Sequence, residues 1–448
     1  MTQTAGVESH LFGRSAARPA PRVTRAEGVW IETEDGRRIL DGSSGALVAS
    51  IGHGVTEVVE AQRAQAESVS YVHGTHFTVD VQELLADRLS ALAPGDLDRV
   101  YPVSGGSEAN ESAMKLARQY FLETGQPARH KVIARWISYH GNTLGALSLS
   151  GHVARRRQYT PMLLDEPHIP PCYCYRCPFD LEYPSCGVKC AHALEDEIKR
   201  QGPEYVAAFI AEPIVGAAGG ALTPPPDYFP IIRAICDRYE VLFIADEVMT
   251  GIGRTGESFA VNHWNVVPDV ITTGKGVSGG YAPLAAMIVR RPIYEAIANG
   301  SGAFVNGFTY GGHAPSMAAG AAVLKYVADH DLVANAARRG AYLAAKLEPL
   351  RSRRIVGDIR GMGLMWGIEF VRDRATKVPF PRSLHIAERV GAIAFERGLI
   401  IYPGFGNADG VDGDQILIGP PLVITEAEID LLVEMLTAAI DEVDASIP

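Results

Sequence analysis

The sequence predicts an α/β protein whose larger lobe is a mostly parallel sheet covered by helices, with a second, smaller α+β lobe. From about residue 100 to residue 290, short apolar runs alternate with helical patterns, and a glycine-bearing or acidic turn follows each run. The runs are apolar on both faces, which is typical of parallel strands covered by helices on both sides. At 448 residues, the chain is also too long for one simple core.

Five apolar runs define the expected strands, at residues 99–103, 131–137, 206–211, 241–245 and 270–273. Because ligands of such sheets lie beyond the carboxyl ends of the strands, the residues that end these runs should meet at one edge. They are Ser104-Gly105-Gly106-Ser107, Tyr139-His140-Gly141, Glu212, Asp246 and Lys275. This edge would carry a glycine-bearing loop, an aromatic ring, two carboxylates and one lysine.

The two ends of the chain are expected to form the smaller lobe together. Residues 28–42 read as an antiparallel hairpin that turns at Asp35-Gly36. The last helix should follow the capping box Thr425-Glu426-Ala427-Glu428. We assign residues 1–75 to an N-terminal segment and part of the small lobe, residues 76–335 to the large cofactor-binding lobe, and residues 336–448 to the rest of the small lobe.

Composition narrows the class of protein. A hydrophobic content of 47%, a charged content of 21% and a net charge of −11 describe a globular protein without a surface for nucleic acid or anionic membranes. No apolar run reaches the roughly 20 residues of a membrane span. The first residues, MTQTAGVESHLFGRS, lack a signal pattern, so a cytoplasmic location is expected.

The loop SGGSEANESAMKLARQYF predicts an anion site. Gly105 and Gly106 precede a helical pattern, Ser107 could cap the helix, and Glu108 would lie in its first turn. Free amides at a helix N-terminus suit a phosphate group. The alternative is an ordinary capped helix start.

Three further residues have a chemical interpretation at the same edge. Lys275 lies between two glycines at the end of an apolar run, where burial would lower its pKa and make its amine a nucleophile. Asp246 ends another run, where a carboxylate requires a cationic partner such as a protonated pyridine nitrogen. Tyr139 offers a flat face for stacking on a ring. The alternatives are a surface lysine, an Asp246–Arg254 pair and a core tyrosine.

Taken together, a phosphate loop, a stacking ring, a carboxylate for a ring nitrogen and a lysine that can form an imine describe pyridoxal 5′-phosphate (PLP), an electron sink for carbanions. Lys275 would then be bare because an aldehyde must reach it. The expected catalytic residues are Lys275, Asp246 and Tyr139.

Six stretches also resemble the ordered signatures of class III, ω-amino acid type, PLP-dependent aminotransferases: SGGSEANESAMKLAR, YHGNTLGALSLSG, AAFIAEPIVGAAGG, IADEVMTGIGRTG, TTGKGVSGGYAPLAA and GFTYGGHAPSMAAGAA. The resemblance runs from about Gly28 to the final helix. It implies PLP fold type I, a sheet of the seven-stranded type, and a homodimer with active sites at the subunit interface. It also implies transfer of an amino group between a small amine and a keto acid by way of pyridoxamine phosphate.

The resemblance implies a set of cofactor-binding residues. Gly106 and Ser107 would hold phosphate, Tyr139 would stack on the ring with His140 and Gly141 completing its turn, and Glu212 would lie on the ring-oxygen side. Asp246 would bind the pyridine nitrogen, Val248 would pack under the ring, and Lys275 would form the imine and then shuttle a proton. Thr309 would reach the phosphate from the partner subunit.

Two departures from the pattern bear on the substrate. Many relatives carry an arginine for a substrate carboxylate where this chain has Leu417, and some ω-amine enzymes carry one in the stretch that reads GNADGVDGDQ here. We therefore expect an ω-amine or a β- or γ-amino acid as donor and pyruvate as acceptor, although an arginine of residues 155–157 could substitute. Arg360 is expected to be mainly structural. The alternatives are an aminomutase or racemase on the same scaffold and a PLP-binding protein without turnover.

Five of the six cysteines lie in the loop CYCYRCPFDLEYPSCGVKC. Cys174, Cys177, Cys186 and Cys190 form C-x2-C-x8-C-x3-C, a spacing that could hold zinc or an iron–sulfur cluster. Free thiols in a surface insertion are the alternative, and disulfides are less favoured in a reducing compartment. We assign no metal to the site. Cys236 is expected to be a core thiol.

Overall fold

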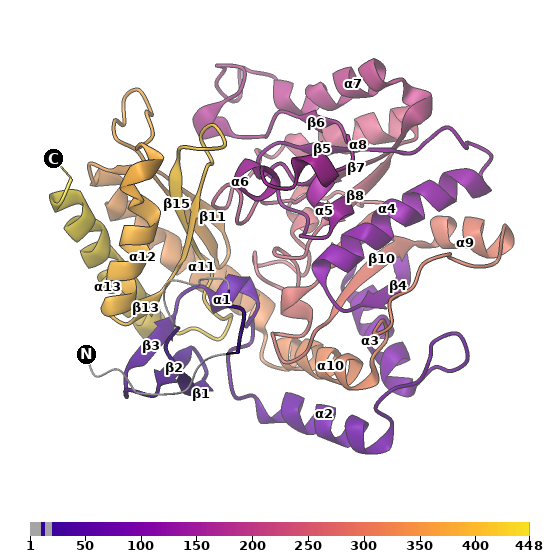
Figure 1. Ribbon diagram of the computed structural model, residues 1–448, viewed down its shortest axis with the longest axis horizontal. Helices are drawn as coiled ribbons and strands as arrows, with labels where there is room; N and C mark the ends of the chain where they lie inside the picture. Colours follow the sequence, from indigo (N-terminus) through magenta and orange to yellow (C-terminus); the bar gives the residue numbers. More distant parts are fainter. Residues whose placement is uncertain (1–9, 14–19, 448) are drawn as a thin grey trace.

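A computed structural model describes residues 10–13 and 20–447 of the protein. A seven-stranded sheet lies at its centre (Figure 1). The cytoplasmic location is expected from the stretch MTQTAGVESHLFGRS, and most of this stretch lies outside the described residues. In order across the sheet, the strands are β4 (Leu97–Val103), β10 (Ala285–Arg290), β9 (Val270–Thr273), β8 (Leu242–Asp246), β7 (Val206–Ala211), β5 (Lys131–Arg135) and β6 (His168–Ile169). The strands from β9 to β6 pair in parallel, and β10 is antiparallel to both of its neighbours. All five runs expected from the sequence are strands of this sheet.

Side chains along the buried strands point to either face of the sheet and contribute to two hydrophobic cores, one on each face. On β7, Ile210 packs with Phe121 of α4 (Gly106–Glu123), whereas its neighbour Phe209 faces the opposite core. Phe209 stacks there on Phe243 with the ring centroids 6.2 Å apart, beside α8 (Tyr228–Tyr239). Because side chains of a strand point alternately to opposite faces, both layers of helices are required to cover these strands.

The other helices of this part surround the same sheet. They are α3 (Asp80–Leu92), α5 (Leu144–Leu149), α6 (Val153–Arg156), α7 (Lys189–Gln201), α9 (Arg291–Asn299) and α10 (Ala314–Asp329). Helix α2 (Thr56–Ser68) packs along α10 at the bottom of the molecule in Figure 1. Among the described residues, no helix combines the length and the apolar character that crossing a bilayer demands.

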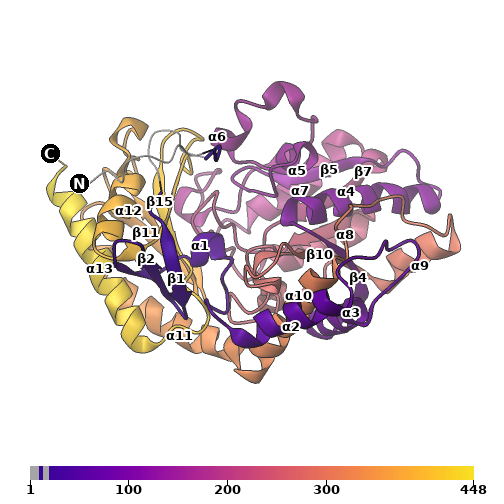
Figure 2. The same ribbon diagram turned by 60° about the horizontal axis from the view of Figure 1, so that its bottom comes forward.

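Two four-stranded sheets, built from both ends of the chain, lie on the other side of the molecule (Figure 2). One has the order β1 (Val23–Glu27), β2 (Trp30–Thr33), β3 (Arg38–Asp41) and β13 (Leu399–Ile400), and the other the order β11 (Val356–Met362), β12 (Met365–Phe370), β15 (Asp414–Ile418) and β14 (Tyr402–Phe405). Helices α1 (Ser44–Leu47), α11 (Leu332–Leu347), α12 (Ile386–Glu396) and α13 (Glu426–Ala445) complete this side.

Several expectations for the chain ends are confirmed. Strands β2 and β3 form the antiparallel hairpin, and Gly36 at its turn has a φ of 82°. Thr425 and Glu428 form the reciprocal capping box before α13. The parallel pair of β13 with β3 joins the two ends in one sheet, and the indole of Trp30 in β2 donates to the carboxylate of Glu428 in α13.

Candidate functional site

The polar residues expected at one edge follow adjacent strands of the central sheet. Asp246 is the last residue of β8, Lys275 lies two residues after β9, and Glu212 directly follows β7. Tyr139 and His140 belong to the turn after β5. Since these strands are parallel neighbours, their carboxyl ends bring the five residues together as the sequence predicts.

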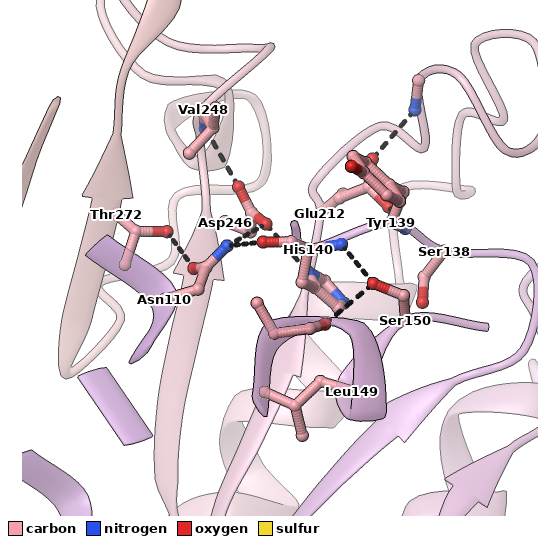
Figure 3. A network of polar contacts seen from close by, with 12 residues as sticks. Asn110, Ser138, Tyr139, His140, Leu149, Ser150, Glu212, Asp246, Val248 and Thr272 are labelled. Carbon is pink, nitrogen blue, oxygen red and sulfur yellow. Dashed lines mark hydrogen bonds and ion pairs between the residues drawn. The ribbon is translucent and has the colours of Figure 1, made fainter. Parts of the chain in front are cut away.

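Asp246 is a buried carboxylate held by three donors (Figure 3). Its Oδ2 accepts a 2.9 Å hydrogen bond from the Asn110 amide and lies 2.7 Å from Nδ1 of His140, and its Oδ1 accepts from the Val248 backbone N–H at 3.1 Å. The alternative of an Asp246–Arg254 pair is wrong, because the Arg254 guanidinium donates to backbone carbonyls instead. The carboxylate is thus fixed from both sides.

Asn110 is a site residue that the sequence analysis missed. Its amide donates both to Asp246 and to the backbone carbonyl of His140, and its Oδ1 accepts from the Thr272 hydroxyl at 2.7 Å. It is fully buried on α4, on the face that also carries Ala113 and Ala117. Asn110 occupies a position of this helix where the helical spacing predicts an apolar residue, and this mismatch was the signal that could have revealed a buried polar residue.

Glu212 joins two of the loops. Its Oε1 accepts from the Tyr139 backbone N–H at 2.8 Å and its Oε2 from that of Gly216 at 3.1 Å. Burial raises the pKa of Glu212, an effect that the nearby His140 opposes. The Glu212 carboxylate therefore fixes the backbone that carries Tyr139.

The glycine-bearing loop differs from the expectation in one respect. Helix α4 begins at Gly106 with Gly105 as N-cap, so the prediction that Ser107 caps the helix is wrong. The Ser107 hydroxyl instead accepts from the Asn142 backbone N–H at 3.0 Å, because Ser107 already lies in the first turn. Its own N–H and that of Gly106 have no acceptor in the part of the chain that the structure describes. Two free amides at the start of an 18-residue helix are what the expected anion site requires, and the binding of an anion there stays a prediction.

Two glycines of the site are required by close packing. A Cβ on Gly106 would lie 2.8 Å from Cγ1 of Val248, and a Cβ on Gly141, whose φ is 143°, would lie 2.5 Å from the Ser107 hydroxyl. Val248 is therefore packed against the start of α4, and the turn after Tyr139 against Ser107. These contacts bring together Gly106, Ser107, Gly141 and Val248, four of the residues that the resemblance assigns to the cofactor site.

Lys275 has an unusual backbone and environment. Its φ of 44° lies in the left-handed region, which side chains other than glycine rarely adopt. Burial lowers its pKa from 10.5 to about 8, the charges of Asp246 and Glu212 oppose that effect, and the charges of Arg155 and Arg254 add to it. The amine is consequently neutral, and nucleophilic, at a lower pH than that of an ordinary lysine.

With PLP as the cofactor that the sequence predicts, this pKa also predicts how the apoprotein takes it up. Only the neutral amine attacks an aldehyde, so the rate of PLP incorporation should rise with pH and level off above about 8, the pKa of Lys275. With Nα-acetyllysine as the control amine, the rate should continue to rise toward pH ~10.4. Stopped-flow absorbance over pH 6 to about 10 measures both profiles, and a PLP incorporation rate that still rises at the upper end of this range, as the control rate does, would contradict the expectation.

Tyr139 has one face covered by a cation. The guanidinium carbon of Arg155, on α6, lies 4.1 Å from the centroid of the Tyr139 ring. One Arg155 nitrogen, Nη2, donates to the Tyr402 hydroxyl at 3.1 Å. Residues 155–157 thus do place an arginine at the site, whereas Leu417 is fully buried in β15.

Thr309 is not brought to the other predicted residues within this chain. It is exposed, and its carbonyl accepts a hydrogen bond from the Tyr71 hydroxyl at 3.0 Å. Its contribution to a partner subunit's phosphate site stays a prediction.

Arg360 has the structural contacts expected of it. From β11 its guanidinium donates to the carbonyls of Gly219 and Gly220, at 2.6 and 2.9 Å, and pairs with Glu369 at 2.8 Å. It joins the C-terminal sheet to the loop that follows Glu212.

The cysteine loop forms a compact group of thiols. Cys174, Cys177, Cys186 and Cys190 line a cavity of about 20 Å³, and the buried Cys172 thiol contacts both Cys174 and Cys190. The Cys172 contact lowers the pKa of Cys174 to about 7. All six cysteines are free thiols, and within residues 10–13 and 20–447 no group of three or more His, Cys, Asp or Glu side chains could hold a metal ion. Cys236 is a buried core thiol, as expected.

Comparisons with known proteins cover nearly the whole chain. The family model described as aminotransferase class-III matches residues 13–440. The chain is 41% identical over 442 residues to the uncharacterized aminotransferase YodT of Bacillus subtilis (strain 168), covering 98% of this chain and 99% of that protein. A thermostable (S)-enantioselective omega-transaminase from Thermomicrobium roseum is 37% identical with a TM-score of 0.90, covering 97% of this chain and 96% of that one. An amine transaminase from an uncultivated Pseudomonas species, in its PLP-bound form, is 35% identical with a TM-score of 0.91, covering 98% and 100%.

Proposed function

Because this chain belongs to the class III aminotransferases, a PLP-dependent family with PLP fold type I, we propose that it transfers an amino group from an ω-amine or a β- or γ-amino acid to pyruvate. The two half-reactions would alternate in a ping-pong cycle, with the cofactor passing between its PLP and pyridoxamine phosphate forms. Two copies of the chain would form the working homodimer.

The described residues fit the cofactor. The unpartnered amides of Gly106 and Ser107 would hold the phosphate, and the buried Asp246 carboxylate would hold the ring nitrogen. Val248 would pack under the ring and Tyr139 would cover its other face, with His140 and Gly141 fixing the turn. Glu212 would face the ring oxygen, and Thr309 would come from the partner subunit. When bound, PLP supplies the electron sink for breaking a bond at the substrate carbon.

The chain's own residues would orient the reactants and move the proton. Lys275 would hold the cofactor aldehyde through Nζ, release it to the incoming amine, and then carry a proton from the substrate carbon on the same Nζ. The lowered pKa of Lys275 supports this role, because a general base is most effective when its pKa lies near the working pH. Asn110 and His140 would keep Asp246 in place throughout.

The substrate proposal rests on Leu417. Its side chain is fully buried in β15, so the position where many relatives carry a carboxylate-binding arginine has no charge to offer. The neighbouring loop, residues 406–413, contains Asp409 and Asp412 and no cation. A keto acid with two carboxylates, such as 2-oxoglutarate, would therefore lack the clamp for its second carboxylate.

A panel of acceptors tests this proposal. With one ω-amine donor in excess, kcat/KM for pyruvate should exceed that for 2-oxoglutarate by about tenfold or more, since an unpaired second carboxylate forfeits a charged hydrogen bond. The donor panel comprises ω-amines, β-alanine, 4-aminobutyrate, taurine and α-amino acids. A preference for 2-oxoglutarate would contradict the proposal, as would the absence of pyridoxamine phosphate after the amine half-reaction.

A further inference from the structure

Arg155 is a cation at the site that the steps above do not use. It is half-buried on α6, and in the described part of the chain no carboxylate lies within ion-pair distance of it. A half-buried guanidinium without an anionic partner is costly unless a ligand supplies one. Its charge nevertheless reaches the reactive amine, since it contributes to the lowered pKa of Lys275.

The position of Arg155 is fixed by its surroundings. It stacks on the Tyr139 ring and donates through Nη2 to Tyr402, which lies in β14. The next residue, Arg156, anchors the short helix by donating to the carbonyls of Ser148 and Ser150, both at 2.6 Å. The guanidinium is thus held beside the ring of Tyr139 with other N–H groups left to donate.

We propose that Arg155 binds the carboxylate of the keto acid acceptor, in place of the arginine missing at Leu417. The inference rests on the proposed function and names the group that recognises the acceptor. A planar guanidinium donates two parallel N–H groups to one carboxylate, a geometry that a lysine does not offer. One arginine holds one carboxylate, which agrees with pyruvate rather than a keto acid with two.

Other arginines near the site are already engaged. Arg254, whose charge also reaches Lys275, is buried and donates to the carbonyls of Leu364 and Pro420. Arg360 is occupied by two backbone carbonyls and by Glu369. Nη2 of Arg254 has no hydrogen-bond partner, but it is buried inside the protein. Arg155 is partly exposed instead, and in the described part of the chain neither a carboxylate nor a backbone carbonyl pairs with its guanidinium.

The test compares a keto acid with an aldehyde that carries no carboxylate. Pyruvate and propanal have the same number of carbons, and propanal has no carboxylate. Arg155→Met should lower kcat/KM for pyruvate by roughly 10- to 100-fold, mostly through KM, because a charged hydrogen bond is lost. For propanal, kcat/KM should change by less than about threefold. Arg155→Lys should recover part of the activity with pyruvate, and the exposed neighbour Arg157→Met is the matched control that should change neither acceptor.

A binding measurement separates recognition from turnover. Propionate is an unreactive monocarboxylate, and its Kd for the PLP-loaded enzyme is measured by ligand-observed NMR. Arg155→Met should weaken propionate binding about tenfold or more, and Arg157→Met should leave it unchanged. Equal losses with pyruvate and propanal would show that Arg155 only supports Tyr139, and unchanged propionate binding would equally overturn the proposal. If the unaltered enzyme transfers no amine to pyruvate, the proposed function fails, while the propionate result still reports on Arg155.

Discussion

Replacing Lys275 by alanine is expected to lower kcat for the amine half-reaction by about 10⁴-fold. The half-buried amine, with its pKa lowered to about 8, has the reactivity that an attack on an aldehyde requires, and the same nitrogen would then move the proton. Alanine removes both functions and leaves the free amides at the start of α4 in place. Stopped-flow spectroscopy of enzyme mixed with excess ω-amine follows formation of pyridoxamine phosphate directly.

Lys199→Ala is the matched control, because this lysine is exposed on the surface of α7, where it pairs with Glu195. It should retain the half-reaction rate of the unaltered enzyme. Borohydride reduction followed by peptide mass spectrometry should also place a pyridoxyl group on Lys275 in the unaltered enzyme. A pyridoxyl group on another lysine, or a half-reaction that survives in Lys275→Ala, would contradict the assignment.

Replacing Asp246 by asparagine is expected to lower the same rate by about 10²- to 10³-fold, because a fixed charge at the site is lost. Asparagine has nearly the same shape and can still accept from the Val248 backbone, but it cannot balance a protonated ring nitrogen. The rate of pyridoxamine phosphate formation and the visible absorption spectrum of the bound cofactor measure the effect.

Asp237→Asn provides the control for this second substitution, since Asp237 is an exposed aspartate on α8 that pairs with Arg233. It should change the rate by less than about twofold, in keeping with the small energy of a surface ion pair. A similar loss in both variants, or a normal rate in Asp246→Asn, would argue against the role given to the Asp246 carboxylate.

Much of the central sheet follows from local pattern. The runs at 206–211 and 270–273 match β7 and β9 residue for residue, because strands buried on both faces are continuously apolar. Strand β6 has two residues, too few for any periodicity, and the antiparallel β10 follows a segment rich in glycine. Neither was identified from the sequence, since pairing with distant neighbours decides both.

In the candidate site, too, some residues could be placed from the sequence and others could not. Asp246, Glu212 and Lys275 could be placed because they end or directly follow strands, and parallel topology brings such positions together. The helical spacing around Asn110 could have shown that it is buried, but not that it contacts Asp246, which lies 136 residues away in the sequence. The stacking of Arg155 on Tyr139 likewise depends on how a short helix meets a turn, which side-chain spacing alone does not determine.

The hydrogen bonds of Arg360 have a consequence for movement within the molecule. The loop whose carbonyls accept from Arg360 also contains Gly216, whose amide holds Glu212, and Glu212 in turn holds the Tyr139 backbone. If the C-terminal sheet rotates when substrate enters or product leaves, either these hydrogen bonds break or the rotation displaces the backbone that carries Tyr139. A mutation more than 100 residues away along the chain, at position 360, could in this way alter the speed of product release without touching any reacting atom.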